Sequence, residues 1–547
     1  MTDRRRVTAR TTRRVALAPL VVLLALFATS PPAPAATPPR VEDDTAPAID
    51  IVIDRMTPAI PEPGDVLRIS GRLVSTVRST ITDVSVQLRR SSSVVANRDA
   101  IAKISGAGLT GDEAADVPLT GTRVAVTEAL APGARQQFSI RIPVDDLGLS
   151  APGTYVLGID ASGLQEGVQT LDTRQGVVRT FLPWFPPGAD ITPVSLVWLW
   201  PLADWPARGP DGVLLTDQTP QALSPDGRLS TLLDLGARFP GVVSWLADPA
   251  LLQTAAAMGG GYQVRQGGAV VVGDREAAAA RWLQGLRQAT RGPGLRVLPY
   301  ADVDASALTR GGLANDVVRA VTQGPAIAAA ALGRGVTTPG NLSWAPFGRI
   351  DRPTLNVLAS SGVTAVVLSA EAMPPTDEAT VTDGLATAAL PTSVGTIRAV
   401  LSDPTLTALL TPASAADTIL ARQRFLAETA VLAPGSQEAP VERALVVAPP
   451  SVRWTASPDL VGPLLRATRS APWLSPLSLD ALLRQPAPST SRQRGGYGPR
   501  AREAELSENV VARIARTSGD LEVFASVVDD PTGLVQPFSE ALLRAES

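Results

Sequence analysis

The chain of 547 residues is long enough for several hydrophobic cores, and its 45% apolar and 18% charged residues are typical of a folded globular protein. It contains no cysteine and no histidine, which excludes disulfides, thiolate chemistry and imidazole as a metal ligand or general base. Any catalysis must therefore use carboxylates, hydroxyls, arginine or backbone groups, and we expect no cofactor.

Residues 1–36 have the pattern of a secretory signal. Basic residues precede an apolar stretch from Val15 to Ala28, and Ala33 and Ala35 supply the small residues of a cleavage site. The alternative is an uncleaved anchor, although the stretch is short against the roughly 20 residues that span a bilayer. Residues 1–35 hold six arginines and one acid, so cleavage would change the net charge from −3 to −8. We expect an extracytoplasmic protein, secreted or envelope-associated, that does not bind nucleic acid.

After a linker at 37–47, residues 48–183 alternate between apolar and polar positions with a period of two, as in the run from Ile49 to Asp54. Several short strands of this kind predict an immunoglobulin-like β-sandwich. The alternation weakens over residues 91–122, where we expect a long loop. Nothing in this region suggests a catalytic site, and we interpret it as an adhesive or spacer module.

Prolines at 183, 186 and 187 predict a stiff hinge, and the two aromatic residues between them should pack on a neighbouring domain. From 190 to 485, short apolar runs alternate with helical segments, which predicts a parallel sheet with right-handed crossovers. About seven strand units suit a closed (β/α) barrel better than the alternative, a doubly wound sheet. The predicted strands are 194–199, 242–246, 295–300, 341–345, 363–369, 396–401 and 444–449. A flexible exposed loop at 486–500 and a helical tail at 501–547 should follow.

Four stretches in this order and spacing carry a resemblance: Trp200–Asp204, Ser244–Leu252, Leu298–Asp304 and Gly362–Ser369. They resemble an uncharacterised family of actinobacterial secreted proteins. The middle part of its members is similar to the barrel shared by polysaccharide deacetylases and certain glycoside hydrolases. The resemblance covers nearly the whole chain and implies a cell-envelope location beside peptidoglycan-precursor export. It also implies a further β-rich region and a C-terminal membrane span, which this sequence lacks. A membrane tether would then need an uncleaved N-terminal segment or a span in a longer parent chain.

In a (β/α) barrel, chemistry takes place in the loops after the carboxyl ends of the strands. Acids that fall at such ends are Asp204, Asp248, Asp302, Asp304, Glu371 and Asp403. Two carboxylates about 5–9 Å apart would suit glycoside hydrolysis, in which one protonates the leaving oxygen and the other attacks or activates water. Our catalytic candidates are Asp204, Glu371, Asp248 and Asp302. The competing interpretation is that these acids cap helices or turns, a common role of Asp before Pro. Asp204 and Glu371 have less obvious structural roles.

The deacetylase mechanism needs a metal held by an aspartate and two histidines, so the lack of histidine excludes it. A carboxylate-only site for Mg²⁺ or Ca²⁺ would need an Asp-rich loop that the sequence does not contain, and we expect no bound metal. Tryptophans near the hinge and the predicted strands could stack on sugar rings or pack inside cores. They are Trp184, Trp198, Trp200, Trp205, Trp245 and Trp344.

Two functions compete. The favoured one is a non-catalytic envelope protein that uses a hydrolase-type barrel as a binding or scaffold module, for cell-wall glycan or another envelope protein. The other is a carboxylate-only glycoside hydrolase that acts on an envelope or storage polysaccharide. Asp204 and Glu371 facing each other across an open mouth would favour the hydrolase. A mouth filled by residues 370–395 or by the sandwich would favour the binding module, since a fold alone does not imply activity.

Overall fold

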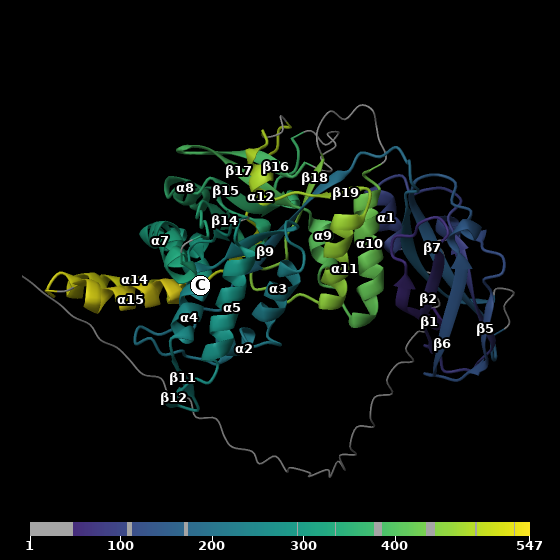
Figure 1. The fold of residues 1–547 in the computed structure, drawn as a ribbon, viewed down its shortest axis with the longest axis horizontal. Helices are drawn as coiled ribbons and strands as arrows, with labels where there is room; N and C mark the ends of the chain where they lie inside the picture. Colours follow the sequence, from purple (N-terminus) through teal and green to yellow (C-terminus); the bar gives the residue numbers. More distant parts are fainter. Residues whose placement is uncertain are drawn as a thin grey trace, which may run out of the picture. The chain divides into compact units, whose positions relative to one another are not determined.

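The chain combines an all-β region with an α/β region built on a parallel sheet (Figure 1). The computed structural model describes residues 47–106, 112–168, 173–292, 294–333, 335–376, 385–433, 443–486, 490–529 and 531–547. The expected signal at 1–36 and nearly all of the linker at 37–47 lie outside these ranges. Within them, no helix is long and apolar enough to cross a membrane.

The described residues of the all-β region form eight strands in two sheets. They are β1 (Ile49–Thr57), β2 (Val66–Ser75), β3 (Ile81–Arg90), β4 (Val117–Pro118), β5 (Val124–Leu130), β6 (Arg135–Pro143), β7 (Gly153–Gln165) and β8 (Arg174–Trp184). One sheet has the order β1-β2-β6, and the other has the order β4-β3-β7-β8 with β5 also paired to β3. Alternate residues of β1, beginning with Ile49, Ile51 and Ile53, are buried in a core that both sheets share. The prediction of an all-β region is therefore confirmed.

The prediction of a long loop over residues 91–122 is wrong. This stretch contains helix α1 (Arg98–Gly106), a short 3-10 helix (Asp112–Ala115) and strand β4. The Asn97 side chain accepts a hydrogen bond from the Ala100 amide (2.9 Å) and so caps the start of α1. A single fully buried residue, Ile101, anchors the helix. One apolar position gives no periodic pattern that could be detected in the sequence.

The parallel sheet has the strand order β13-β10-β9-β18-β17-β15-β14. Its strands are β9 (Val194–Leu202), β10 (Val243–Ala247), β13 (Arg296–Val297), β14 (Leu342–Trp344), β15 (Ala365–Ser369), β17 (Gly395–Ser402) and β18 (Ala444–Val447). Each of the seven predicted ranges overlaps one of these strands, and the prediction of a parallel sheet is confirmed. The amides of Leu295 and Val297 donate to the carbonyls of Thr337 and Pro339, just before β14 (3.0 Å each). These two bonds link the segment that contains β13, the first strand of the order, to the segment that precedes β14, the last one.

Further strands flank this sheet and were not predicted. Strand β16 (Thr387–Thr392) pairs antiparallel with β17, and β19 (Leu474–Pro476) pairs in parallel with the first residues of β9. Strands β11 (Gln263–Gln266) and β12 (Ala269–Val272) form a separate hairpin.

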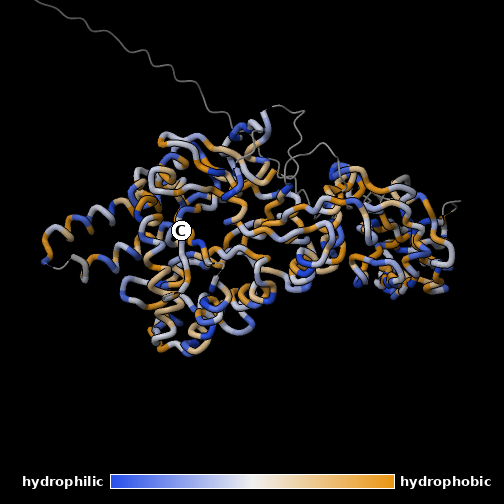
Figure 2. The backbone as a smooth tube through the Cα atoms, turned by 45° about the horizontal axis from the view of Figure 1, so that its top comes forward, coloured by the Kyte–Doolittle hydropathy of each residue, from blue (hydrophilic) through white to orange (hydrophobic). Residues whose placement is uncertain are grey.

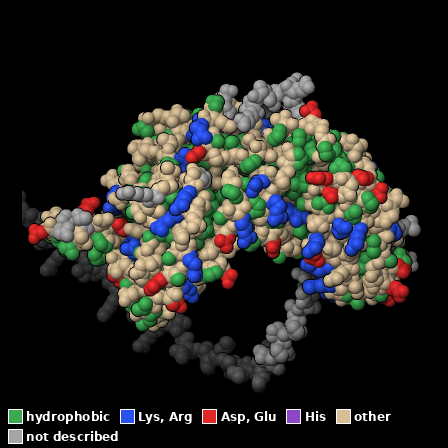
Figure 3. Space-filling view, viewed as in Figure 1, with side chains coloured by type: hydrophobic (Ala, Val, Ile, Leu, Met, Phe, Trp, Pro, Cys, Tyr) green, Lys and Arg blue, Asp and Glu red, His purple; other side chains and the backbone are tan. Residues whose placement is uncertain are grey.

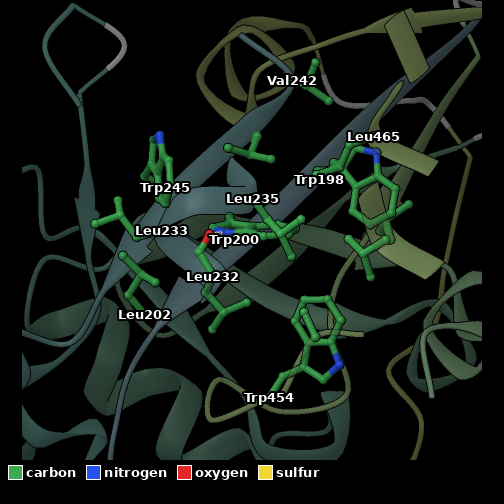
Figure 4. Close-up of a cluster of buried hydrophobic side chains, with 14 of the residues drawn as sticks. Trp198, Trp200, Leu202, Leu232, Leu233, Leu235, Val242, Trp245, Trp454 and Leu465 are labelled. Atoms are coloured by element: carbon green, nitrogen blue, oxygen red, sulfur yellow. Dashed lines mark hydrogen bonds between the residues drawn. The ribbon is translucent and has the colours of Figure 1, made fainter. Parts of the chain in front are cut away.

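Strand β9 is buried along its whole length. On one face, Val197 and Leu199 share a cluster with side chains from β10, β14, β15, β17 and β18. On the other face, Trp198 and Trp200 pack against the surrounding helices (Figure 4). Their indole N–H groups donate to the Thr468 hydroxyl (3.1 Å) and to the carbonyl of Leu232 (3.0 Å), so neither buried indole lacks a partner.

Helices follow most of the strands. They are α2 (Gln218–Ala222), α3 (Arg228–Ala237), α4 (Pro249–Gly259), α5 (Glu276–Ala289), α6 (Ala305–Arg310), α7 (Ala314–Leu332), α8 (Arg352–Ser360), α9 (Pro404–Leu409), α10 (Thr418–Ala430), α11 (Pro458–Ser470) and α12 (Leu479–Arg484). Asp304 caps α6 through the Ala307 amide (2.9 Å), and Asp351 caps α8 through the Thr354 amide (2.8 Å).

The last part of the described chain is helical, with α13 (Pro499–Glu503), α14 (Glu508–Ala525) and α15 (Pro531–Ala545). Helices α14 and α15 run side by side, and apolar and polar stretches alternate along both (Figures 1 and 2). Part of the predicted loop at 486–500 lies along the segment after β15. The amides of Gln493 and Gly495 donate to the carbonyls of Pro374 (3.0 Å) and Ala372 (2.7 Å). Its flexibility stays a prediction, and residues 487–489 lie outside the described ranges.

The two aromatic residues of the predicted hinge belong to different cores. Trp184 packs in the core of the all-β region. Phe185 packs in the core around β9, where its ring lies 5.1 Å from that of Trp473. Consecutive residues therefore anchor the chain in both cores.

Replacing Trp198 with alanine should strongly destabilise the parallel-sheet region. The side chain is fully buried and stacks on Phe425, with ring centroids 5.6 Å apart. We expect a loss of about 3–5 kcal/mol in the free energy of unfolding, measured by denaturant titration. The control is Trp205→Ala, because that side chain is 53% exposed and its loss should cost less than about 1 kcal/mol. Equal losses for the two variants would contradict this assignment of the core.

Candidate functional site

The carboxyl ends of the parallel strands meet in a set of loops that we call the mouth. It comprises residues 203–208, 248, 298–304, 345–351, 370–376, 403 and 448–454, and all of the predicted catalytic candidates lie in it. The partners of each acid decide what it can do chemically.

Asp204 follows β9 and is buried in an ion pair with Arg228, the first residue of α3 (3.0 Å). The same guanidinium donates to the carbonyls of Ala203 (2.7 Å) and Trp454 (3.2 Å). The pair thus joins the start of α3 to two loops of the mouth. This gives Asp204 a structural role that the sequence did not suggest, because no local pattern marks an arginine 24 residues away.

Asp248 caps helix α4, as the Asp-Pro pattern indicated. Its Oδ1 accepts hydrogen bonds from the amides of Ala250 (2.9 Å) and Ala301 (2.8 Å). The second bond holds the turn after β13, where Ala301 and Asp302 have left-handed φ angles of 63° and 51°. The carboxyl is only 1% exposed, and burial, together with the nearby charge of Asp302, raises its pKa to about 7.

Asp302 forms an ion pair with Arg453 (2.9 Å), which lies in the loop after β18. The guanidinium also lies over the ring of Trp205, 4.1 Å from its centroid. Burial raises the pKa of Asp302 to about 6, although the charge of Arg453 works in the opposite direction. The Asp302 side chain remains 20% exposed and lines a cavity of about 300 Å³ with Trp205 and Trp344.

Asp304 lines the same cavity, but its carboxylate accepts hydrogen bonds from backbone amides. Besides capping α6, it accepts a hydrogen bond from the amide of Leu506 (2.8 Å). Burial raises its pKa. It therefore ties α6 to the segment that leads into α14.

Glu371 and Asp403 line a different cavity of about 400 Å³. Asp403 caps α9 through the Leu406 amide (2.8 Å) and accepts two hydrogen bonds from Arg98 of helix α1 (2.6 and 2.9 Å). Glu371 is exposed, whereas Asp204 is buried against Arg228. Glu371 thus lines its cavity without Asp204, and the arrangement that would favour a hydrolase, with the two acids facing each other, finds no support here.

The sequence did not reveal Arg228, Arg453 and Arg98, which balance the strand-end acids. It also left open which tryptophans belong to cores. Those in cores are Trp184, Trp198, Trp200 and Trp245, whereas Trp205 and Trp344 reach the cavity beside Asp302. Among the residues that the structure describes, no group of three or more acids is placed to hold a metal ion.

Replacing Asp248 with asparagine should change how stability depends on pH. Because its pKa rises from 3.8 to about 7 on folding, the unfolded chain ionises first as the pH increases. The wild type should therefore lose stability between about pH 4 and pH 7, by up to about 4 kcal/mol. Asparagine keeps the acceptor oxygen but does not titrate, so the free energy of unfolding of Asp248→Asn should decline less over this pH range, although Asp302, whose pKa is also raised, still contributes. Asp248→Ala, the control, should lose the cap at every pH. A decline of the same size in Asp248→Asn would contradict the assignment.

Comparison with known proteins finds one matching family model and several solved structures with a distantly similar fold. Residues 8–547 match the model of a family of unknown function, DUF6049. No curated protein sequence matches the chain.

Two of the similar solved structures are an α-amylase and a glucanotransferase. The α-amylase AmyC from Thermotoga maritima has a TM-score of 0.42 at 9% identity, over 62% of this chain and 84% of that one. A 4-alpha-glucanotransferase from Thermococcus litoralis has a TM-score of 0.36 at 10% identity, over 60% of this chain and 44% of that one. The match thus spans less than half of the glucanotransferase. A CARDB domain from Pyrococcus furiosus has a TM-score of 0.16 at 10% identity, over 25% and 89%.

These structural likenesses are distant and say nothing about activity. The family match, in contrast, runs over nearly the whole chain. The chain belongs to the family of unknown function DUF6049.

Proposed function

We propose that this protein is exported to the cell envelope and that its parallel-sheet region is a non-catalytic binding or scaffold module. One observation carries the proposal: the buried strand-end acids are bound to other groups of the same chain. Asp204 pairs with Arg228, Asp302 with Arg453, and Asp403 with Arg98.

Glycoside hydrolysis needs two carboxyl groups that can reach the scissile bond, one as an acid and one as a base or nucleophile. Asp248 is almost completely buried and accepts two backbone hydrogen bonds, so it serves the fold. Glu371 is exposed, and three other acids line its cavity. Asp403 and Glu428 are both bonded to Arg98, whereas Asp99 is exposed in helix α1. These settings favour structural roles for the acids.

The envelope location is supported by the amino-acid sequence. The basic start, the apolar stretch and the small residues at Ala33 and Ala35 are those of a cleaved signal. Figure 3 shows basic and acidic side chains interspersed on the face that it draws, without the single-sign surface of a nucleic-acid-binding protein. Cell-wall glycan or another envelope protein is the partner that we propose.

A second candidate is a glycoside hydrolase that uses Asp248 and Asp302. Asp302 follows Ala301, whose amide binds Asp248, so the two acids are close, and their pKa values are raised to about 7 and about 6. Between these values Asp248 would be mainly protonated and Asp302 mainly ionised, as an acid and base pair requires. Any such activity should have its maximum near pH 6.5. The near-complete burial of Asp248 argues against it.

Incubation with peptidoglycan and α-glucan fragments from pH 5 to pH 8 tests the proposal. We expect retention of a glycan on the immobilised protein without new reducing ends. The comparison variants are Asp302→Asn and the double variant Asp204→Asn with Glu371→Gln. Cleavage by the wild type that Asp302→Asn loses, and the double variant keeps, would establish the hydrolase instead. Cleavage that only the double variant loses would show instead that Asp204 and Glu371 are the catalytic pair.

Export predicts a mature protein that begins at Ala36 and lies outside the cytoplasm, because Ala33 and Ala35 form the cleavage site. N-terminal sequencing of the chain recovered from cell fractions measures this. Replacing Ala33 and Ala35 with arginine should block processing and keep the precursor in the membrane fraction. A wild-type chain that retains residues 1–35 in the cytoplasm would contradict export.

A further inference from the structure

The cavity beside Asp302 has the size and lining of a small-ligand site. Its volume of about 300 Å³ is at the lower end of the ~300–1,000 Å³ range typical of ligand pockets. Two tryptophans line it: Trp205, which is 53% exposed, and Trp344, which is half-buried. An exposed tryptophan at a concave surface is unusual, because burial of such a large apolar side chain is favourable.

Trp205 is held in place although it is exposed. The Arg453 guanidinium lies over its ring at 4.1 Å, and Asp302 fixes that guanidinium through the ion pair of 2.9 Å. A planar ring held in this way offers apolar area without loss of side-chain freedom on binding. The C–H face of a pyranose ring is an apolar surface of matching shape.

Thr354 provides an independent indication of a ligand. Its side chain is 1% exposed and lines the cavity, yet its Oγ1 has no hydrogen-bond partner in the described part of the chain. The cap of α8 uses the Thr354 amide, not the hydroxyl. Buried polar groups normally have a partner, so this hydroxyl is available to a ligand in the cavity that Thr354 lines.

The charges around the cavity indicate which ligands fit. Three acids line it, Asp302, Asp304 and Glu505, and the arginine among the lining residues is already paired with Asp302. Arg310 pairs with Glu505. The lining is therefore negative on balance and disfavours anions such as phosphates or uronic acids. Carboxylate and hydroxyl oxygens instead accept and share hydrogen bonds with neutral hydroxyl groups.

Backbone strain is concentrated at the same place. Ala301, Asp302 and Phe347 are three of the four non-glycine residues with positive φ in the described chain. Asp302 lines the cavity, and Phe347 follows Pro346, which also lines it. Strained residues of this kind gather at binding and catalytic sites, where the surrounding structure maintains them.

We propose that this cavity binds one neutral pyranose residue of a glycan. The sugar ring stacks on Trp205 and Trp344, and its hydroxyl groups hydrogen-bond to Asp302 and Thr354. Arg453 is a positioning residue that holds Asp302 and Trp205. This assignment rests on the proposed binding function and names its ligand class.

Calorimetric titration of the full chain with single sugars tests the proposal. The probes are the methyl glycosides of glucose, galactose, mannose and N-acetylglucosamine, with glucosamine and glucuronate as charged comparisons. We expect a neutral glycoside to bind with a Kd of about 1 mM or tighter. Trp205→Ala should weaken this binding about tenfold or more. Thr354→Val, which keeps the side-chain shape, should weaken it about three- to tenfold.

Two measurements separate a binding role from a structural one. Thr354→Val should unfold at the same or a higher temperature than the wild type, because it removes a buried hydroxyl that has no protein partner. Phe524→Ala, which removes an exposed aromatic side chain from α14, should leave sugar binding unchanged.

The possible failures are distinguishable. The proposal is overturned if no neutral glycoside binds, if a charged probe binds better, or if Trp205→Ala binds as tightly as the wild type. Hydrolysis of a bound methyl glycoside would overturn the non-catalytic function but leave the sugar site in place. Absence of both binding and hydrolysis would overturn the sugar site alone.

Discussion

The burial of strand β9 on both faces is the constraint on which the rest of the α/β region depends. All residues from Val194 to Leu202 are buried, and the strand pairs with β18 on one side and with β10 and β19 on the other. A shift of one residue would place Trp198 among the aliphatic side chains of the opposite face and leave the smaller Val197 in the apolar space that the tryptophan fills. The register is therefore fixed, and so is the position at which each neighbouring strand ends.

Because the strand ends are fixed, the acids that follow them can hold the loops of the mouth. Asp248 joins the start of α4 to the turn after β13, and Asp204 joins the loop after β9 to α3. These bonds use the carboxylates that glycoside hydrolysis would need. They also leave a small cavity whose most accessible aromatic side chain, Trp205, is supported by Arg453. The same arrangement underlies both the proposed non-catalytic function and the proposed sugar site.

Short-range patterns predicted a large part of this structure. Strands with both faces buried appear as continuous apolar runs, so the seven strands in the order from β13 to β14 could be located before the fold was known, whereas β16 and β19 could not. Aspartate at a helix start forms bonds within three residues, and the caps at Asp248, Asp304 and Asp403 were therefore foreseeable. Helix α1 was missed because its one buried residue, Ile101, gives no periodic signal.

The sequence alone determined where strands, caps and the candidate acids lie, because these features depend on neighbours a few residues apart. Only the tertiary structure decided what each acid contacts. The arginines bound to Asp204, Asp302 and Asp403 are 24, 151 and 305 residues away along the chain. No local pattern encodes such pairs, since they form only when packing around β9 brings distant loops together. Trp198, Trp200 and Trp205 lie close together in the sequence. In the folded chain Trp198 and Trp200 are buried within strand β9, whereas Trp205 lies beyond the end of the strand and is exposed.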